Sequence, residues 1–179
     1  MQLENDLYAI DKTLLVKAGQ VINRNTLKRI AALSGDHIDQ PIKDTWLMKD
    51  LIETFQDQRY TNILYPPEVN QHVIRCISHL KIPEKIFLEL AFMKEKSPAT
   101  YHHILVIAIL AAKISLDQSI KCVFATDMAI ILSLFHDLGK SRIPDSILDK
   151  KTPLTLQERK MLSTHPLIGY ILLHYYFGN

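Results

Sequence analysis

An adjacent histidine and aspartate, His136 and Asp137, stand at the end of a strongly apolar segment that begins near Met128. Polar groups at the buried end of such a segment need partners, because burying them unpaired is costly. A bound metal ion would satisfy both side chains. An imidazole together with a carboxylate suits iron, manganese or zinc better than calcium. The first chemical hypothesis is therefore a transition-metal site.

Two cationic residues follow this pair. Gly139 is expected to let the backbone bend, and Lys140 and Arg142 follow it within one helical turn. Cations beside a metal ion stand where a phosphate group would bind. We therefore expect Lys140 and Arg142 to bind a phosphate of the substrate.

Helices must position these residues, because only five glycines and eight prolines interrupt long segments of helical apolar periodicity. Thr126 and Asp127 are expected to cap the helix that carries the histidine–aspartate pair, with Gly139 as its C-terminal stop. Thr155 and Glu158 have the spacing of a capping box. The sequence predicts helices over residues 25–33, 46–55, 68–80, 83–96, 100–116, 126–137, 155–164 and from 166 onward.

The beginning of the chain has a different pattern. Tyr8 to Val21 is rich in leucine, valine and isoleucine, with Gly19 as a turn, which predicts one or two short strands. Tyr65-Pro66-Pro67 is the clearest break, since paired prolines resist both helix and sheet. The sequence predicts a mainly α protein, with a small α+β module over residues 1–65 and a helical domain over residues 66–179.

Composition narrows the class of protein. The chain of 179 residues is 47% apolar, and its net charge of +2 gives no broad attraction to a nucleic acid polymer or a membrane. The N-terminus is acidic, unlike a secretory signal, and the longest apolar run, Ile104 to Ala112, is shorter than the ~20 residues of a membrane span. We expect a cytoplasmic protein without a membrane span, in which Cys76 and Cys122 are free buried thiols.

A longer motif surrounds the histidine–aspartate pair. Residues 136–150 read HDLGKSRIPDSILDK, and residues 154–169 read LTLQERKMLSTHPLIG. This chain resembles the HD-GYP subfamily of the HD superfamily, a group of bacterial signalling phosphohydrolases with the patterns HD-x-GK-x-x-IP-x-x-IL-x-K, LT-x-x-E and H-P-x-x-G. Residues 18–22, AGQVI, and the helix after them are similar to an accessory module often placed before HD-GYP domains.

The resemblance implies an HD-domain helical bundle whose metal centre hydrolyses the phosphodiester cyclic di-GMP. Carried over by position, the metal ligands would be His103, His136, Asp137 and His165. Asp137 would bridge the ions and Lys140 would contact a substrate phosphate, so that these two are the expected catalytic residues. The expected cofactor is a divalent metal, with iron or manganese favoured and one or two ions bound.

The upstream ligand could be either of two adjacent histidines. Residues 100–103 read TYHH and fit the T-Y-x-H pattern of the family only if His103 is the ligand and His102 the variable position. Ala99 stands where members with three metals have a glutamate, which argues against a third ion. The later elements of the family, a His-His pair, an aspartate and the Gly-Tyr-Pro motif, would follow residue 179, so the domain is expected to be truncated before that motif.

Alternative readings remain open. A catalytically inactive module could bind a cyclic dinucleotide, a diguanylate cyclase domain or a second copy through the last helix, whose residues 172–177 are expected to be exposed and apolar on more than one face. A different HD phosphohydrolase could act on nucleotides, although the IP-x-x-IL and H-P-x-x-G elements argue against it. Finally, His103 and His165 could be core histidines hydrogen-bonded to Asp137.

Overall fold

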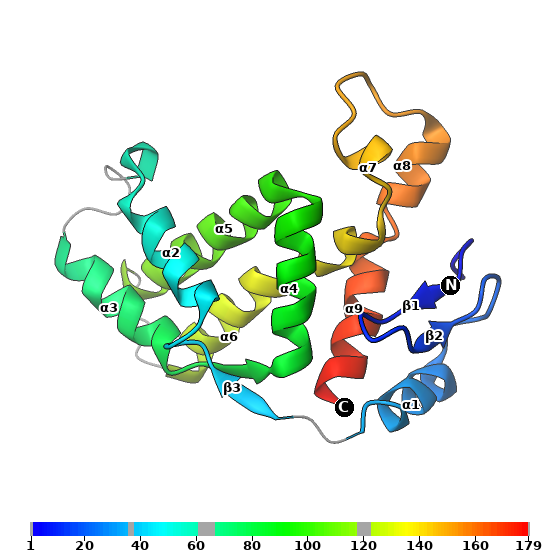
Figure 1. Cartoon of the computed structure of the whole chain (residues 1–179), viewed down its shortest axis with the longest axis horizontal. Helices are drawn as coiled ribbons and strands as arrows, with labels where there is room; N and C mark the ends of the chain where they lie inside the picture. Colours follow the sequence, from blue (N-terminus) through cyan, green and yellow to red (C-terminus); the bar gives the residue numbers. More distant parts are fainter. Residues whose placement is uncertain (1, 36–37, 61–66, 118–122, 179) are drawn as a thin grey trace. The chain divides into compact units, whose positions relative to one another are not determined.

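The computed structural model describes residues 2–35, 38–60, 67–117 and 123–178, without the side chains of residues 67–70, 72, 116–117 and 123–124. The chain forms two compact units, each built from separate segments (Figure 1). Unit 1 comprises Met1–Ile38, Pro83–Pro98 and Asp137–Asn179, and unit 2 comprises Asp39–Ile82 and Ala99–His136. The predicted domain boundary after residue 65 stays a prediction, and the break at Tyr65-Pro66 lies outside the described residues.

Helices dominate the structure, which confirms the predicted mainly α class with short strands near the N-terminus. The helices are α1 Arg24–Ala32, α2 Trp46–Gln56, α3 Pro67–Ser78, α4 Glu84–Lys96, α5 Pro98–Asp117, α6 Val123–Phe135, α7 Asp145–Leu148, α8 Leu156–Leu162 and α9 His165–Phe177, with 3-10 turns η1 Gln58–Tyr60 and η2 Leu138–Arg142. The predicted short strands are β1 Leu7–Tyr8 and β2 Leu14–Val16, which pair antiparallel. The strands β3 Asp39–Pro41 and β4 Lys81–Pro83 form a second sheet that the sequence analysis missed.

The β1–β2 hairpin closes through a tight turn. The backbone N–H of Ala9 donates to the carbonyl of Thr13 at 2.9 Å, and that of Lys12 donates to the carbonyl of Ala9 at 3.1 Å. Lys12 has a φ of 66°, which is a left-handed conformation that costs a non-glycine residue free energy. Because this conformation persists only where its surroundings impose it, the contacts of the hairpin tip with the rest of unit 1 hold the turn in place.

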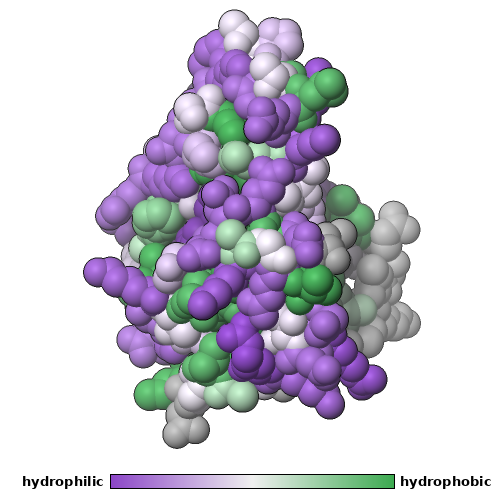
Figure 2. Space-filling view, turned by 90° about the vertical axis from the view of Figure 1, so that its right-hand side faces the viewer, coloured by the Kyte–Doolittle hydropathy of each residue, from purple (hydrophilic) through white to green (hydrophobic). Residues whose placement is uncertain are grey.

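The last helix is the centre of unit 1, where it contacts α1 and η2 (Figure 1). Its residues Leu172, Tyr175 and Tyr176 are buried. The prediction that this helix is exposed was therefore wrong, because residues from both ends of the chain supply the neighbours that the sequence pattern does not reveal. Figure 2 shows the side of the molecule with β1, β2, α1 and α8, which is mostly hydrophilic with scattered hydrophobic residues.

In unit 2, α5 is the core helix. It is long and apolar enough to cross a membrane by length and composition, over Pro98–Ser115. However, its buried residues recur every three or four positions and form one stripe: Tyr101, Ile104, Leu105, Ala108, Ile109 and Ala112. The Tyr101 hydroxyl also donates to a carboxylate oxygen of Asp50, on α2, at 2.8 Å. Such a stripe is typical of a helix packed into a protein core and does not indicate a membrane span.

The start of α6 differs from the prediction. The helix begins at Val123, so that Thr126 and Asp127 lie inside it instead of capping it. Nε2 of His79, the residue after the end of α3, lies 3.2 Å from Oδ1 of Asp127. The aspartate therefore has a tertiary partner from a distant segment of unit 2, which a local capping rule cannot anticipate. Cys76, on α3, is a free cysteine as predicted but is only half-buried, and Cys122 lies outside the described residues.

The predicted capping box at the start of α8 is confirmed. The Thr155 hydroxyl accepts from the Glu158 N–H at 3.2 Å, and the Glu158 carboxylate accepts from the Thr155 N–H at 2.7 Å. We expect Thr155→Ala to lower the free energy of unfolding by ~1 kcal/mol, because an orphan N–H at the helix start loses its acceptor. Denaturant unfolding followed by circular dichroism measures this loss. Thr152→Ala, outside the helix, is the control, and an equal loss in both variants would contradict the prediction.

Candidate metal centre

The histidine–aspartate pair lies where α6 gives way to η2. The backbone N–H of His136 still donates to the carbonyl of Leu132 at 2.8 Å, so helical hydrogen bonding continues one residue past Phe135. Asp137 then occupies the position before η2 without a side-chain capping hydrogen bond. The side chain of His136 is exposed, whereas Asp137 has only 4% of its surface exposed. A buried carboxylate at this junction needs cationic or metal partners, as the sequence pattern suggested.

Two of the predicted ligand histidines share one local geometry. His136 Nδ1 lies 2.8 Å from the carbonyl oxygen of Ser133, and His165 Nδ1 lies 2.7 Å from that of Leu162. A carbonyl can only accept, so in both rings Nδ1 carries a hydrogen and Nε2 is the atom left to bind a metal. A backbone acceptor at Nδ1 that orients the ring is the usual support of a metal-binding histidine. Both rings are therefore prepared to bind a metal through Nε2.

The two adjacent histidines of α5 lie in different surroundings. The ring centroid of His103 lies 5.5 Å from that of His136. His102 Nε2 instead forms a hydrogen bond of 3.1 Å with the hydroxyl of Tyr60. The geometry therefore favours His103 over His102 as the ligand that α5 would contribute.

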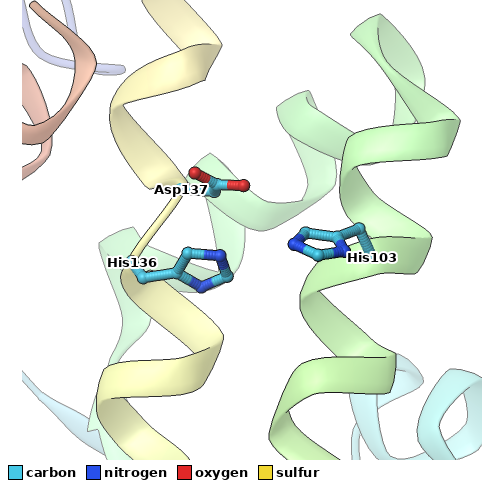
Figure 3. A group of neighbouring side chains, drawn as sticks. All are labelled: His103, His136 and Asp137. Carbon is cyan, nitrogen blue, oxygen red and sulfur yellow. The ribbon is translucent and has the colours of Figure 1, made fainter. Parts of the chain in front are cut away.

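His103, His136 and Asp137 together form a group that could hold a metal ion. Each offers one ligand atom, and these atoms lie within 4.8 Å of one another. Figure 3 shows the two rings and the carboxylate directed toward a common space. Two imidazoles with one carboxylate suit a divalent transition metal, and three protein ligands leave coordination positions for water or substrate. The donor set thus fits the divalent metal that the sequence analysis expected.

His165, the remaining predicted ligand, lies beside the carboxylate of Asp137. Its Nε2 is 3.4 Å from Asp137 Oδ1. These two predicted ligands thus lie next to each other, one just before η2 and the other at the first residue of α9. The alternative interpretation, in which His165 is a core histidine that only partners Asp137, predicts the same contact. A measurement of metal binding therefore has to distinguish the two interpretations.

Two glycines allow η2 and α9 to approach closely enough for this contact. A Cβ added to Gly139 would overlap the backbone carbonyl oxygen of His165 and would lie 2.5 Å from the backbone nitrogen of Gly169. The sequence interpretation of Gly139 as a helix stop was therefore wrong. It lies inside η2, after α6 has ended, and its missing side chain makes room for the backbone of α9.

Lys140 and Arg142 have different partners. Lys140 Nζ donates to Asp137 Oδ2 at 2.7 Å, so this ammonium lies at the candidate centre. The Arg142 guanidinium donates to Glu89, to the Ser141 hydroxyl and to the carbonyl of Tyr8. The protein itself occupies the donors of Arg142 in this structure, and its predicted contact with substrate stays a prediction.

The sequence analysis overlooked Glu89. On α4 this residue shares the buried face with Ile86, Leu90 and Met93, and it is fully buried. The available signal was an acidic residue at helical spacing within an apolar face, which implies a cationic partner elsewhere in the chain.

Comparison with known proteins supports an HD domain. Residues 100–179 match the family model described as HD domain, and this range contains every predicted ligand and both predicted phosphate-binding cations. A curated relative, the cyclic di-GMP phosphodiesterase response regulator RpfG of Xanthomonas campestris pv. campestris (strain 8004), is 53% identical over 38 residues. That alignment covers 21% of this chain and 10% of the relative. No solved structure matches this chain significantly.

Proposed function

We propose that this chain is a metal-dependent phosphodiesterase of the HD-GYP type that hydrolyses cyclic di-GMP or a related cyclic dinucleotide. The observation that carries the proposal is the group formed by His103, His136 and Asp137, within the range that matches the HD domain. The short similarity to a cyclic di-GMP phosphodiesterase supports the choice of substrate. Iron or manganese is the proposed ion, with one or two bound.

The proposed ligands are His103, His136, Asp137 and His165. The carbonyl groups that accept from Nδ1 of His136 and His165 hold these rings in place for binding. When bound, the ion supplies Lewis-acid polarisation of the phosphodiester and activation of water. Lys140 holds one oxygen of Asp137 and can donate to an anionic phosphate oxygen of the substrate, so its proposed role is charge stabilisation.

Metal binding and hydrolysis test this proposal together. The chain is purified anaerobically and reconstituted with Fe(II) or Mn(II), and the metal content per chain and the hydrolysis of cyclic di-GMP are measured. We expect at least one ion per chain and release of the linear dinucleotide. In His103→Ala, Mn(II) affinity should fall by more than ~10-fold because a ligand is lost.

His102→Ala is the matched control, because this neighbouring histidine on α5 is hydrogen-bonded to the hydroxyl of Tyr60 in η1. It should bind Mn(II) like the wild type. Equal Mn(II) affinity in both variants would overturn the metal site. Bound metal, or bound cyclic di-GMP, without hydrolysis would overturn the enzymatic function and leave the non-catalytic signalling module.

A further inference from the structure

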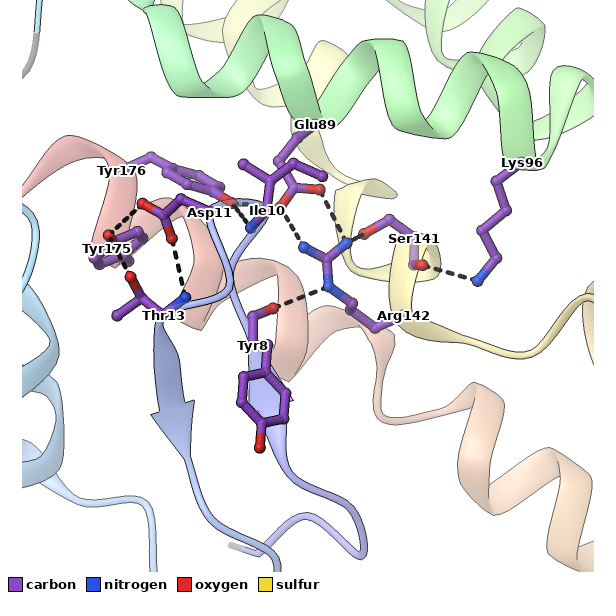
Figure 4. A network of polar contacts seen from close by, with 10 residues as sticks. All are labelled: Tyr8, Ile10, Asp11, Thr13, Glu89, Lys96, Ser141, Arg142, Tyr175 and Tyr176. Atoms are coloured by element: carbon purple, nitrogen blue, oxygen red, sulfur yellow. Dashed lines mark hydrogen bonds and ion pairs between the residues drawn. The ribbon is translucent and has the colours of Figure 1, made fainter.

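A fully buried carboxylate, that of Glu89, lies on the apolar face of α4. Taking a carboxylate out of water is expensive unless charge and hydrogen bonds compensate it. Figure 4 shows the residues of unit 1 that compensate the charge of this carboxylate.

Arg142 and Tyr176 satisfy this carboxylate. Arg142 Nη1 donates to Glu89 Oε2 at 3.0 Å, and Nη2 donates to Oε1, which makes a two-pronged ion pair. The Tyr176 hydroxyl donates to the same Oε1. Burial and the neighbouring carboxylate raise the pKa of Tyr176 above its usual range, so the phenol remains neutral and remains a donor. The carboxylate of Glu89 is thus held from two elements, η2 and α9.

The guanidinium of Arg142 also reaches the N-terminal hairpin and its own turn. Its Nε donates to the carbonyl of Tyr8 at 3.0 Å, and its Nη1 donates to the Ser141 hydroxyl at 2.7 Å. The hairpin is held a second time, because the Ile10 N–H donates to the Tyr176 hydroxyl at 3.0 Å. One planar cation therefore fixes the end of η2 to α4 and to β1 (Figure 4).

A second contact from α4 holds the same end of η2. Lys96 Nζ donates to the backbone carbonyls of Ser141 and Ile143, at 2.9 and 2.7 Å. Lys96 follows Glu89 by about two helical turns, so both side chains leave one face of α4. The turn η2, which both side chains hold, begins directly after Asp137 and contains Lys140. The orientation of η2 therefore determines where the carboxylate of Asp137 and the ammonium of Lys140 point.

We propose that Glu89 is a positioning residue of the metal centre, which acts through Arg142 by fixing the orientation of η2. This inference rests on the proposed function. A buried ion pair seldom stabilises a fold more than apolar residues of equal volume would. Unlike apolar packing, the hydrogen bonds between Arg142 and Glu89 fix the direction in which η2 points. This difference can be measured.

The experiment replaces both charges by apolar residues. Glu89→Leu or Arg142→Met alone leaves a buried charge unpaired and should destabilise the fold, whereas the double variant removes both charges. We expect the double variant to recover most of the thermal unfolding midpoint that either single variant loses, yet to bind Mn(II) ~10–100-fold more weakly than the wild type. A double variant with recovered stability and wild-type Mn(II) affinity would overturn the proposal.

If the double variant does not fold, Arg142→Lys tests the positioning role instead. It keeps the charge beside Glu89, but a single ammonium lacks the planar fork that serves Glu89 and the Tyr8 carbonyl together. Hydrogen exchange in the metal-free protein is its second readout. The η2 amides of Lys140 and Ile143, which donate to Asp137 and Lys140 carbonyls, should exchange at least ~10-fold faster than in the wild type. Unchanged exchange and unchanged Mn(II) affinity would refute the positioning role.

Lys85→Met is the matched control for the network. Lys85 also lies on α4, where it pairs with Asp11 at 3.0 Å and donates to the Tyr175 hydroxyl, and neither partner belongs to η2. It should leave Mn(II) affinity and the exchange of the η2 amides unchanged. A wild-type chain that binds no Mn(II) would instead refute the proposed function, and the exchange readout would still decide whether Glu89 and Arg142 orient the turn.

Discussion

Gly139→Ala is expected to destabilise the protein by on the order of 3 kcal/mol. The added methyl group would overlap the carbonyl oxygen of His165 and crowd the backbone nitrogen of Gly169, at 2.5 Å. Both are backbone atoms in the first turns of α9, so no side-chain rotation relieves the overlap. The helix has to move away from η2, which also separates His165 from Asp137. Denaturant unfolding and Mn(II) titration measure the two effects.

Gly169→Ala is the matched control for that contact. A Cβ on Gly169 would lie 3.3 Å from the nitrogen of Gly139, which requires a shift of only a few tenths of an ångström. Alanine is also favoured over glycine within a helix by roughly 1 kcal/mol, which offsets part of the crowding. We expect a change within about 1 kcal/mol of the wild type. Equal stability of the two variants would show that the backbones do not approach as described.

Asp137→Asn is expected to weaken Mn(II) binding by more than ~100-fold, beyond the loss typical of groups that only support a ligand. The amide keeps the size of the side chain but removes the charge that lies beside Lys140 Nζ, at 2.7 Å, and His165 Nε2, at 3.4 Å. Lys140 is a cation and His165 is a proposed metal ligand, so the loss of the negative charge affects ion binding more than packing. Isothermal titration of the metal-free protein with Mn(II) measures the change, and circular dichroism verifies the fold.

Asp149→Asn is the control for the charge change, since this exposed aspartate lies in the same unit. It should bind Mn(II) like the wild type. If Asp137→Asn and Asp149→Asn had the same affinity, Asp137 would not be a ligand, and the alternative in which His165 merely partners this carboxylate would be favoured.

Local patterns determined much of the structure. Helical periodicity located most helices within a few residues, and the capping box of Thr155 and Glu158 was found from four residues alone. These features depend on interactions between neighbours in the chain, which a sequence displays directly. The motif around His136 and Asp137 also indicated the HD domain, and the family match over residues 100–179 supports it.

Predictions failed where the partner is distant in the sequence. The N–H of Ile42 donates to the carbonyl of Leu80 beside the unpredicted second sheet. Asp127 lies inside α6 and meets His79, just after α3, and Leu172 is covered by neighbours in unit 1. In each case the decisive contact joins segments whose separation no local rule spans, because burial and pairing are properties of the assembled chain.

The same distinction between local patterns and distant contacts applies to the candidate metal centre. The sequence by itself indicated a metal site at His136 and Asp137 from residue type, and its resemblance to the HD-GYP subfamily added His103 and His165 as candidates. Only the tertiary structure decided that His103 and not His102 lies beside His136, and that Gly139 admits the backbone of α9. It also decided that the donors of Arg142 meet Glu89 and the hairpin. These outcomes depend on how separate helices approach one another, which packing settles after the local elements have formed.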